Sequence, residues 1–184
     1  MTPEIAAPLR HVVRVEAIKT RGTPVAVTAG PAERQAVATA LGLASVEALE
    51  GRYSLSRNGD RVRLEGKIEA ALHQTCVVTL EPFPVKLSVP VELDFAPEVE
   101  SRVAARRGGD AEEIDVEVML GEADPPEPIV DGTIDLGSVT VEFLSLALDP
   151  YPRKPGVAFS EPAPELQEER SPFAALARLG RGEK

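Results

Sequence analysis

The most regular pattern of apolar and polar residues lies between Phe83 and Phe95. Every odd position of this segment is apolar and every even position is polar or proline, a period of two that is typical of a half-buried strand. Thirteen residues at about 3.3 Å each span roughly 40 Å, so we expect the strand to bend across a curved sheet. Pro90 cannot donate to a strand ladder, which indicates an edge strand or a bulge.

Two alternating segments precede this strand and predict a β-hairpin. One face of each strand is mostly apolar: Leu49, Gly51, Tyr53 and Leu55 in the first, and Val62, Leu64, Ile68, Ala70 and Leu72, interrupted by Gly66, in the second. Between them, Asn58-Gly59 is among the strongest short signals for a hairpin turn. We therefore expect two antiparallel strands joined by a tight turn.

Further periodic segments predict three strands and two helices. The strands are expected over 10–18, 25–27 and 114–120. The first helix is expected over 31–41, because Pro31 suits the first helical turn and Gly42 can end the helix.

The second helix is expected to begin after a cap at Asp135 and to run to about Leu148. Asp149-Pro150 would end it, because the residue before a proline is disfavoured in the helical conformation. Its expected apolar face comprises Leu136, Val139, Phe143, Leu146 and Ala147.

Together these elements predict an α+β fold, with a curved, mostly antiparallel, barrel-like β-sheet and two packing helices. Apolar residues make up 43% of the 184 residues, which is enough for a core. We expect a flexible N-terminal tail over 1–9 and one domain over 10–159 that contains a flexible insertion over 97–111. Residues 160–184 are expected to form a disordered tail with a short terminal helix from Ser171.

The net charge of −10 is concentrated in residues 64–135, which hold seventeen acidic and five basic residues. Such a surface repels phosphate backbones and attracts basic partners, so neither DNA binding nor autonomous RNA binding is expected. Five Phe, two Tyr and no Trp offer little for base stacking. No apolar stretch reaches the ~18 residues of a membrane span, and the N-terminus lacks the pattern of a signal peptide. The cytoplasm is therefore the expected compartment.

Residue types that carry metal, redox or catalytic chemistry are few and scattered. Cys76 is the single cysteine, so neither an intramolecular disulfide nor a multi-cysteine zinc site can form, and we interpret it as a buried structural thiol. His73 is expected to be hydrogen bonded or at the surface. Ser145 and Asp149 belong to no recognised nucleophile motif, and the carboxylates of 110–131 lack EF-hand spacing. No catalytic residue, cofactor or metal site is predicted.

The most unusual local feature is the segment 148–156, in which three prolines surround Tyr151, Arg153 and Lys154. Aromatic and cationic side chains on a stiffened loop are typical of an interaction hot spot. A helix stop with cations that face solvent would show the same pattern. Composition alone does not separate these two interpretations.

At these residues the chain resembles a known family. The segment 76–82, Cys-Val-Val-Thr-Leu-Glu-Pro, is followed by Ile-Asp-Leu-Gly over 134–137, by Glu142, and by Leu-Ala-Leu-Asp-Pro-Tyr-Pro-Arg-Lys-Pro-Gly over 146–156. These motifs resemble the YceD family, whose members are called large ribosomal RNA subunit accumulation proteins, and its alphaproteobacterial branch in particular. We take polar and aromatic members of the motifs as candidate interaction residues: Tyr151, Arg153, Lys154, Glu81, Asp135 and Glu142.

The chain departs from that family at one motif. Many members read Cys-x-Arg-Cys-Leu-Glu-Pro, whereas Val78 stands here at the Arg position and Thr79 at the second Cys. The resemblance therefore implies no metal or redox role for a cysteine pair in this chain.

The resemblance implies a non-enzymatic bacterial factor that is needed for normal accumulation of 23S ribosomal RNA, and hence for large-subunit biogenesis. Its partner would be a large-subunit ribosomal precursor, a ribosomal protein or an assembly factor, and direct contact with rRNA stays open. Two alternatives also stay open. One is an acidic holder of a single free ribosomal protein, and the other is an enzyme or small-ligand carrier that uses the inside of the curved sheet.

Overall fold

The computed structural model describes residues 7–97 and 125–159. The chain divides into two units, Met1–Lys154 and Pro155–Lys184, and the helices and strands of the described residues belong to the first. Their order is β1 (Val12–Arg14), the 3-10 helix η1 (Val15–Ala17), β2 (Thr23–Thr28), α1 (Pro31–Ala40), β3 (Ser45–Asn58), β4 (Arg61–Thr75), β5 (Pro82–Pro97), β6 (Glu127–Ile129), β7 (Thr133–Asp135) and α3 (Leu136–Ala147). In this part of the chain, no helix is long and apolar enough to cross a membrane.

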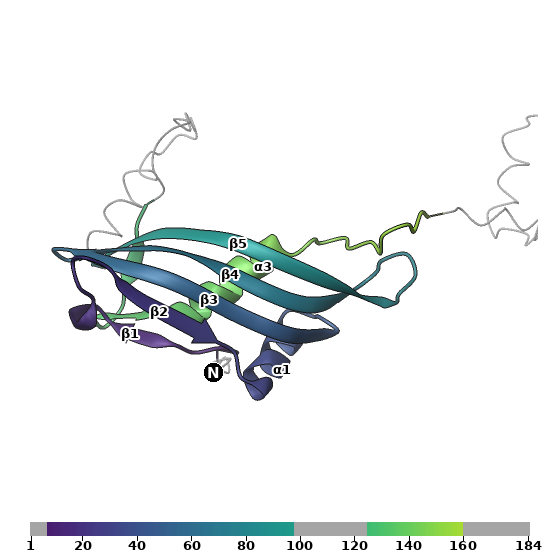
Figure 1. Ribbon diagram of the computed structural model, residues 1–184, viewed down its shortest axis with the longest axis horizontal. Helices are drawn as coiled ribbons and strands as arrows, with labels where there is room; N and C mark the ends of the chain where they lie inside the picture. The colour runs from purple at the N-terminus through teal and green to yellow at the C-terminus, as the bar shows by residue number, and fades with distance from the viewer. Residues whose placement is uncertain (1–6, 98–124, 160–184) are drawn as a thin grey trace, which may run out of the picture. The chain divides into compact units, whose positions relative to one another are not determined.

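A five-stranded sheet in the order β2-β3-β4-β5-β6 forms the framework (Figure 1). Its neighbouring strands are antiparallel except for β5 and β6, which run parallel. β1 and β7 form a separate antiparallel pair. The predicted α+β class and the mostly antiparallel sheet are confirmed. Within the described residues the sheet is open at β2 and is not closed into a barrel.

The long strands follow the predicted alternation. β3 and β4 form the expected hairpin, and its two-residue loop is Gly59-Asp60. Gly59 has a φ of +63°, a left-handed conformation that glycine adopts without steric cost. β5 pairs with β4 along its length, whereas β6 reaches β5 only over Phe95–Pro97. Among the described residues, Pro90 therefore has a neighbouring strand on one side only, which is the edge position that the sequence offered as the alternative to a bulge.

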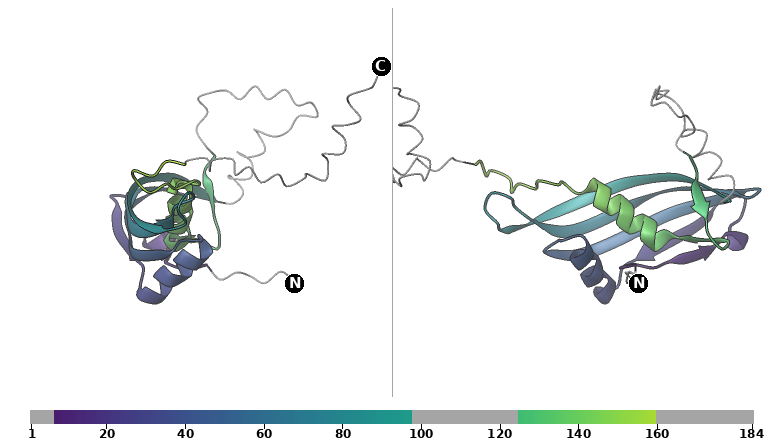
Figure 2. Two further views of the ribbon diagram at one scale, coloured as in Figure 1. Left: turned by 90° about the vertical axis from the view of Figure 1, so that its right-hand side faces the viewer. Right: turned by 180° about the vertical axis from the view of Figure 1, so that it is seen from behind.

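The inner face of the sheet forms the core together with the two helices. Figure 2 shows α3 running across this face of the sheet. The most deeply buried large side chains come from β3, β4 and α3: Leu55, Leu64, Ile68, Leu72, Leu136 and Leu144. Because these side chains are almost completely removed from solvent, the space between sheet and helix is a packed core.

Helix α3 has the predicted limits but not quite the predicted apolar face. Asp135 caps it by accepting the N–H of Gly137 at 3.0 Å. Leu146 is 75% exposed, however, whereas Thr140 and Leu144 are buried. The hydroxyl of Thr140 donates to the carbonyl of Leu136 at 2.6 Å, which lets a polar residue occupy the core face. The sequence pattern alone therefore placed the face slightly wrong.

The N-terminal strand is shorter than predicted, because the chain turns into η1 after Arg14. Val15 and Ile18 are both buried. Two residues three positions apart lie on one side of a 3-10 turn but on opposite sides of a strand. Leu9, which the sequence assigned to the tail, is 2% exposed and packs in the core.

Two short strands were not predicted. β6 and β7 have three residues each, too few to show a period in the sequence. Three predicted features lie outside the described residues. They are the strand expected over 114–120, the insertion over 97–111 except Pro97, and the terminal helix from Ser171.

Candidate functional site

Two segments that are distant in the sequence are bonded to each other beside the end of α3. One is the β4–β5 loop, residues 76–81, and the other is residues 148–154, which follow α3; together they are called the loop pair here. The hydrogen bonds that join them run from the Val77 N–H to the Pro152 carbonyl at 2.9 Å, from the Lys154 N–H to Cys76 Sγ at 3.4 Å, and from Gln74 Nε2 at the end of β4 to the Asp149 carbonyl at 3.1 Å. Two of the segments that carry the family resemblance, 76–82 and 146–156, thus contribute to one surface.

The β4–β5 loop is closed by its own backbone. The N–H of Cys76 donates to the carbonyl of Glu81, and the N–H of Leu80 donates to the carbonyl of Cys76, each at 2.9 Å. Leu80 has a φ of +59°, a conformation that is uncommon for residues with a Cβ atom. Its side chain is 77% exposed. The loop therefore holds a leucine out in solvent.

The segment after α3 is fixed by local bonds and prolines. Leu148 leaves the helix in an extended conformation, with φ −71° and ψ 138°. Asp149 Oδ1 accepts the N–H of Tyr151 at 2.9 Å, which makes an Asx turn. Pro150 and Pro152 restrict φ on either side of the tyrosine. Tyr151 is consequently 73% exposed on a constrained backbone.

One ion pair also crosses the loop pair. Nζ of Lys154 lies 2.9 Å from Oε2 of Glu81. Both side chains are largely exposed, so solvent screens the pair and it contributes at most about 1 kcal/mol to stability. Arg153 is exposed and makes no ion pair with a described residue. Lys154 is therefore engaged within the surface, and Arg153 faces solvent.

Cys76 lies beneath this surface. It is buried, as predicted. The hydrogen bond from the Lys154 backbone, followed by bonds from the hydroxyl and the backbone of Thr79, lowers the pKa of Cys76 to about 6, although burial acts in the opposite direction. Thr79 is the residue at the position of the second cysteine in the resembling family, and here its hydroxyl is a partner of the sulfur.

Two of the six candidate residues lie away from the loop pair. Asp135 caps α3 and accepts the N–H groups of His11 and Gly137. Twelve helical residues at 1.5 Å each, or about 18 Å, separate this cap from the end of α3 where the loop pair begins. Glu142 is exposed along the helix. The structure thus brings together Tyr151, Arg153, Lys154 and Glu81.

The remaining candidate side chains have ordinary roles in the fold. His73 is hydrogen bonded, with Nδ1 3.1 Å from Oγ of Ser45 and 3.1 Å from Oε1 of Glu47. The hydroxyl of Ser145 donates to the carbonyl of Glu142. Of the carboxylates in 110–131, only Glu127 and Asp131 are described. In the described ranges, no group of three or more His, Cys, Asp or Glu residues is placed to hold a metal ion.

Sequence reasoning missed Val77 and Leu80 as parts of the surface, and Gln74 as the buried side chain that supports it. Val77 is 45% exposed, and Gln74 is buried beneath the loop pair. The available signal was a run of apolar residues, Val77, Val78 and Leu80, that continues after the strand period ends and before Pro82. Apolar residues that follow one another in a short turn are exposed together, and exposed apolar residues that lie together indicate a surface that a partner can cover.

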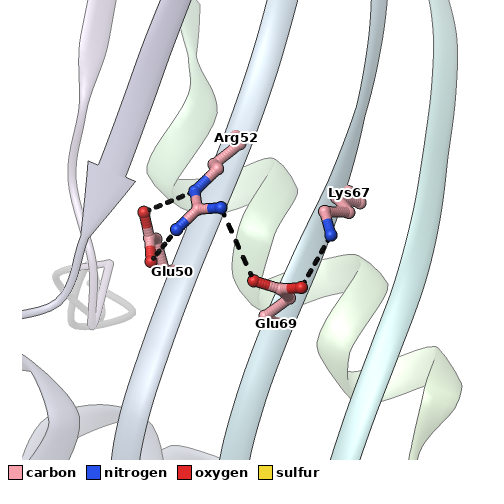
Figure 3. A network of polar contacts seen from close by, with 4 residues as sticks. All are labelled: Glu50, Arg52, Lys67 and Glu69. Atoms are coloured by element: carbon pink, nitrogen blue, oxygen red, sulfur yellow. Dashed lines mark hydrogen bonds and ion pairs between the residues drawn. The ribbon is translucent and has the colours of Figure 1, made fainter.

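The outer face of the sheet is charged, and the cations of its two networks are paired with carboxylates. Arg52 pairs with Glu50 at 2.8 Å and lies 3.9 Å from Glu69, which also pairs with Lys67 at 2.7 Å (Figure 3). The hydrogen bond from Lys67 is the largest cause of a lowered pKa of Glu69. A second network on this face joins Arg63 to Glu65, Glu92 and Asp94. Cations that are neutralised in this way offer little to a phosphate backbone.

Comparison with known proteins gives one match. Residues 64–180 match the model of the family described as "Large ribosomal RNA subunit accumulation protein YceD". The match begins within β4 and covers both segments of the loop pair. Neither the curated proteins nor the solved structures contain a match to this chain. Because the family match spans more than half of the 184 residues, the chain belongs to the YceD family.

Proposed function

We propose that this protein supports the accumulation of 23S ribosomal RNA and the biogenesis of the large ribosomal subunit by binding, and that the loop pair is its contact surface. The family name connects the chain to large-subunit RNA. The observation that carries the choice of surface is the set of hydrogen bonds that joins residues 76–81 to residues 148–154. The partner is a precursor particle, a ribosomal protein or an assembly factor.

Preorganisation supports this choice of surface. Tyr151 and Arg153 are exposed on a backbone that is held by the Asx turn, by two prolines and by the bonds to Gln74, Val77 and Cys76. A side chain on such a backbone loses little conformational entropy when it is bound. Tyrosine and arginine are also the residue types that most often dominate binding energy at interfaces. The alternative interpretation, a simple helix stop, does not require these bonds to a second loop.

The packing of the sheet disfavours a small-ligand carrier or an enzyme that works inside it. The inner face of the sheet is covered by α3, and Leu64, Ile68 and Leu72 are at most 1% exposed. A carrier needs a cavity lined by such residues, and here they form the core. Binding at an outer surface therefore fits the fold better than chemistry inside it.

The experiment is sedimentation of the tagged full chain through a sucrose gradient of cell lysate, at low and at moderate salt. The wild-type protein should migrate with large-subunit precursors at both salts. Arg153→Ala combined with Lys154→Ala should weaken this association while the thermal midpoint stays unchanged, because the Lys154–Glu81 pair is exposed and the Lys154 N–H is retained.

The matched control is Arg52→Ala combined with Lys67→Ala, which removes the same charge from the outer face of the sheet. It should sediment like the wild type. If both double variants lost association with the precursors equally, the loss would be an effect of net charge and not of the loop pair. If the Arg153/Lys154 variant were unfolded, the loop would have a structural role instead. Wild-type protein that stays at the top of the gradient with one small basic protein would favour the free-protein holder.

A further inference from the structure

The loop pair exposes several large apolar side chains in addition to its charged residues. Seven large apolar residues are exposed in the described part of the chain. Three of them, Val77, Leu80 and Tyr151, belong to the loop pair, and Leu146 lies in the last turn of α3 just before it. Their exposed fractions are 45% for Val77, 77% for Leu80, 73% for Tyr151 and 75% for Leu146. Gathered apolar side chains on an otherwise charged protein mark an interaction surface.

Leu80 is the most informative of these residues. Among the described residues other than glycine, only Leu80 and Asp131 have a positive φ. Aspartate and asparagine tolerate the left-handed conformation, whereas leucine is disfavoured there by its Cβ atom. The Leu80 side chain also lies in solvent, so it adds nothing to the core. Stability of the fold therefore gives no reason for leucine here, and a contact outside the domain does.

The charges at the loop pair favour a protein over a nucleic acid. Lys154 is paired with Glu81, and the Asp149 carboxylate lies beside Tyr151. At the loop pair, a phosphate backbone would meet these two carboxylates and a single cation, Arg153, that forms no ion pair with a described residue. Nucleic-acid surfaces instead neutralise several phosphates with several Lys or Arg side chains. A protein surface needs one carboxylate to complement Arg153, with apolar area around it.

We propose that Val77, Leu80 and Tyr151 form an apolar docking surface for a protein, and that this partner presents an apolar patch with a carboxylate opposite Arg153. The inference rests on the proposed function, because it names the partner chemistry of the same loop pair. Leu80 and Tyr151 are expected to contribute most to binding, because they are the most exposed apolar side chains of the loop pair. Leu146 extends the surface onto the end of α3.

The test measures binding of the full chain to three purified probes at low and at moderate salt: large-subunit precursor particles, the protein fraction extracted from those particles, and protein-free 23S RNA. Leu80→Asn should weaken binding to the particles and to the protein fraction at least tenfold. Its thermal midpoint should be equal to or above that of the wild type, because asparagine relieves the left-handed strain. Tyr151→Ala is an independent variant with the same expected loss.

The matched control is Val130→Asn, which removes a 55%-exposed apolar side chain away from the loop pair and should bind like the wild type. If Leu80→Asn and Tyr151→Ala both bound with wild-type affinity, this inference would be overturned. The proposed function would still stand if the Arg153/Lys154 variant bound the particles more weakly than the wild type. Equal binding to protein-free RNA, falling steeply with salt, would identify RNA as the occupant and also overturn it. Wild-type protein that binds none of the probes would overturn the proposed function itself.

Discussion

The phenolic oxygen of Tyr53 in β3 lies 2.7 Å from Oγ1 of Thr140 in α3, and both residues are buried. The Thr140 hydroxyl proton is directed to the carbonyl of Leu136 at 2.6 Å. Because each hydroxyl has a single proton, Tyr53 is the donor and Thr140 the acceptor in their shared bond. Burial raises the pKa of Tyr53 and so keeps the phenol protonated as a donor. This bond fixes α3, and with it the start of the loop pair, to the sheet.

Tyr53→Phe should lower the free energy of unfolding by about 1 kcal/mol, because the hydrogen bond is lost while Thr140 keeps its bond to Leu136. Thr140→Val should cost more, about 2 kcal/mol, because it leaves the buried phenol without its acceptor. Urea denaturation of both variants and of the double variant measures these values. The double variant should lose less than the sum of the two, and strict additivity would contradict the hydrogen bond between Tyr53 and Thr140.

The ring of Tyr53 also requires glycine in the neighbouring strand. A Cβ atom at Gly66 would contact the carbonyl oxygen of Arg52 and lie 2.7 Å from Cδ1 of Tyr53. The carbonyl belongs to the backbone and cannot rotate away, so we expect Gly66→Ala to cost about 3 kcal/mol. Gly42→Ala is the control, since nothing lies within 4 Å of its Cβ and its φ of +65° alone should cost about 1 kcal/mol. Similar midpoints in urea for the two variants would contradict the close approach.

The sequence predicts those parts of the fold whose determinants are local. The strand from Phe83 to Phe95 and the β3–β4 hairpin are confirmed, because a period of two and a glycine turn appear directly in the chain. The apolar face of α3 was only partly predicted, because the back-bonded Thr140 behaves as a core residue although threonine counts as polar. The 3-10 turn at Val15 was missed because it interrupts a strand pattern after three residues.

The candidate site was predictable as two segments but not as one surface. Tyr151, Arg153 and Lys154 were identified by their proline-restricted loop, and Glu81 by the motif that contains it. The pairing of Lys154 with Glu81 crosses 73 residues, and no local pattern encodes such a distance. The exposure of Leu80 depends on a left-handed φ, and leucine gives no sequence signal for that conformation.

Asp135 is expected to act mainly on the stability of α3. Its Oδ1 accepts from His11 and from Gly137, and its Oδ2 lies 3.3 Å from the hydroxyl of Ser138. Asp135→Ala should lower the free energy of unfolding by about 2 kcal/mol, at the upper end for an N-cap, because the His11 N–H also loses its acceptor.

Two further variants show whether the loss of stability in Asp135→Ala comes from the helix cap. Asp135→Asn retains an acceptor at the cap and should cost only a few tenths of a kcal/mol, roughly, by thermal or urea denaturation. Glu142→Ala, on the exposed face of the same helix, should change stability by less than about 0.5 kcal/mol. Should Asp135→Ala prove as stable as the wild type, the cap would not hold α3 in place.

The thiol of Cys76 should make the stability of the protein depend on pH. Hydrogen bonds from Lys154 and Thr79 lower its pKa to about 6 in the folded chain, whereas a cysteine in an unfolded chain titrates near about 8.5. Between these two values the unfolded chain binds more protons than the folded one, so the free energy of unfolding rises with pH. The contribution is complete above the unfolded pKa and is lost as the pH falls through about 6.

Cys76→Ser isolates this contribution, because a serine hydroxyl does not titrate in the range and can still accept the Lys154 N–H. The difference in free energy of unfolding between wild type and Cys76→Ser should therefore grow from about pH 6 to about pH 8.5 and then level off. Urea denaturation at several pH values measures the slope directly. A difference that does not vary with pH would mean that the Lys154 N–H does not favour the thiolate, and the bond that fastens residues 148–154 to the β4–β5 loop would then be weaker than its geometry indicates.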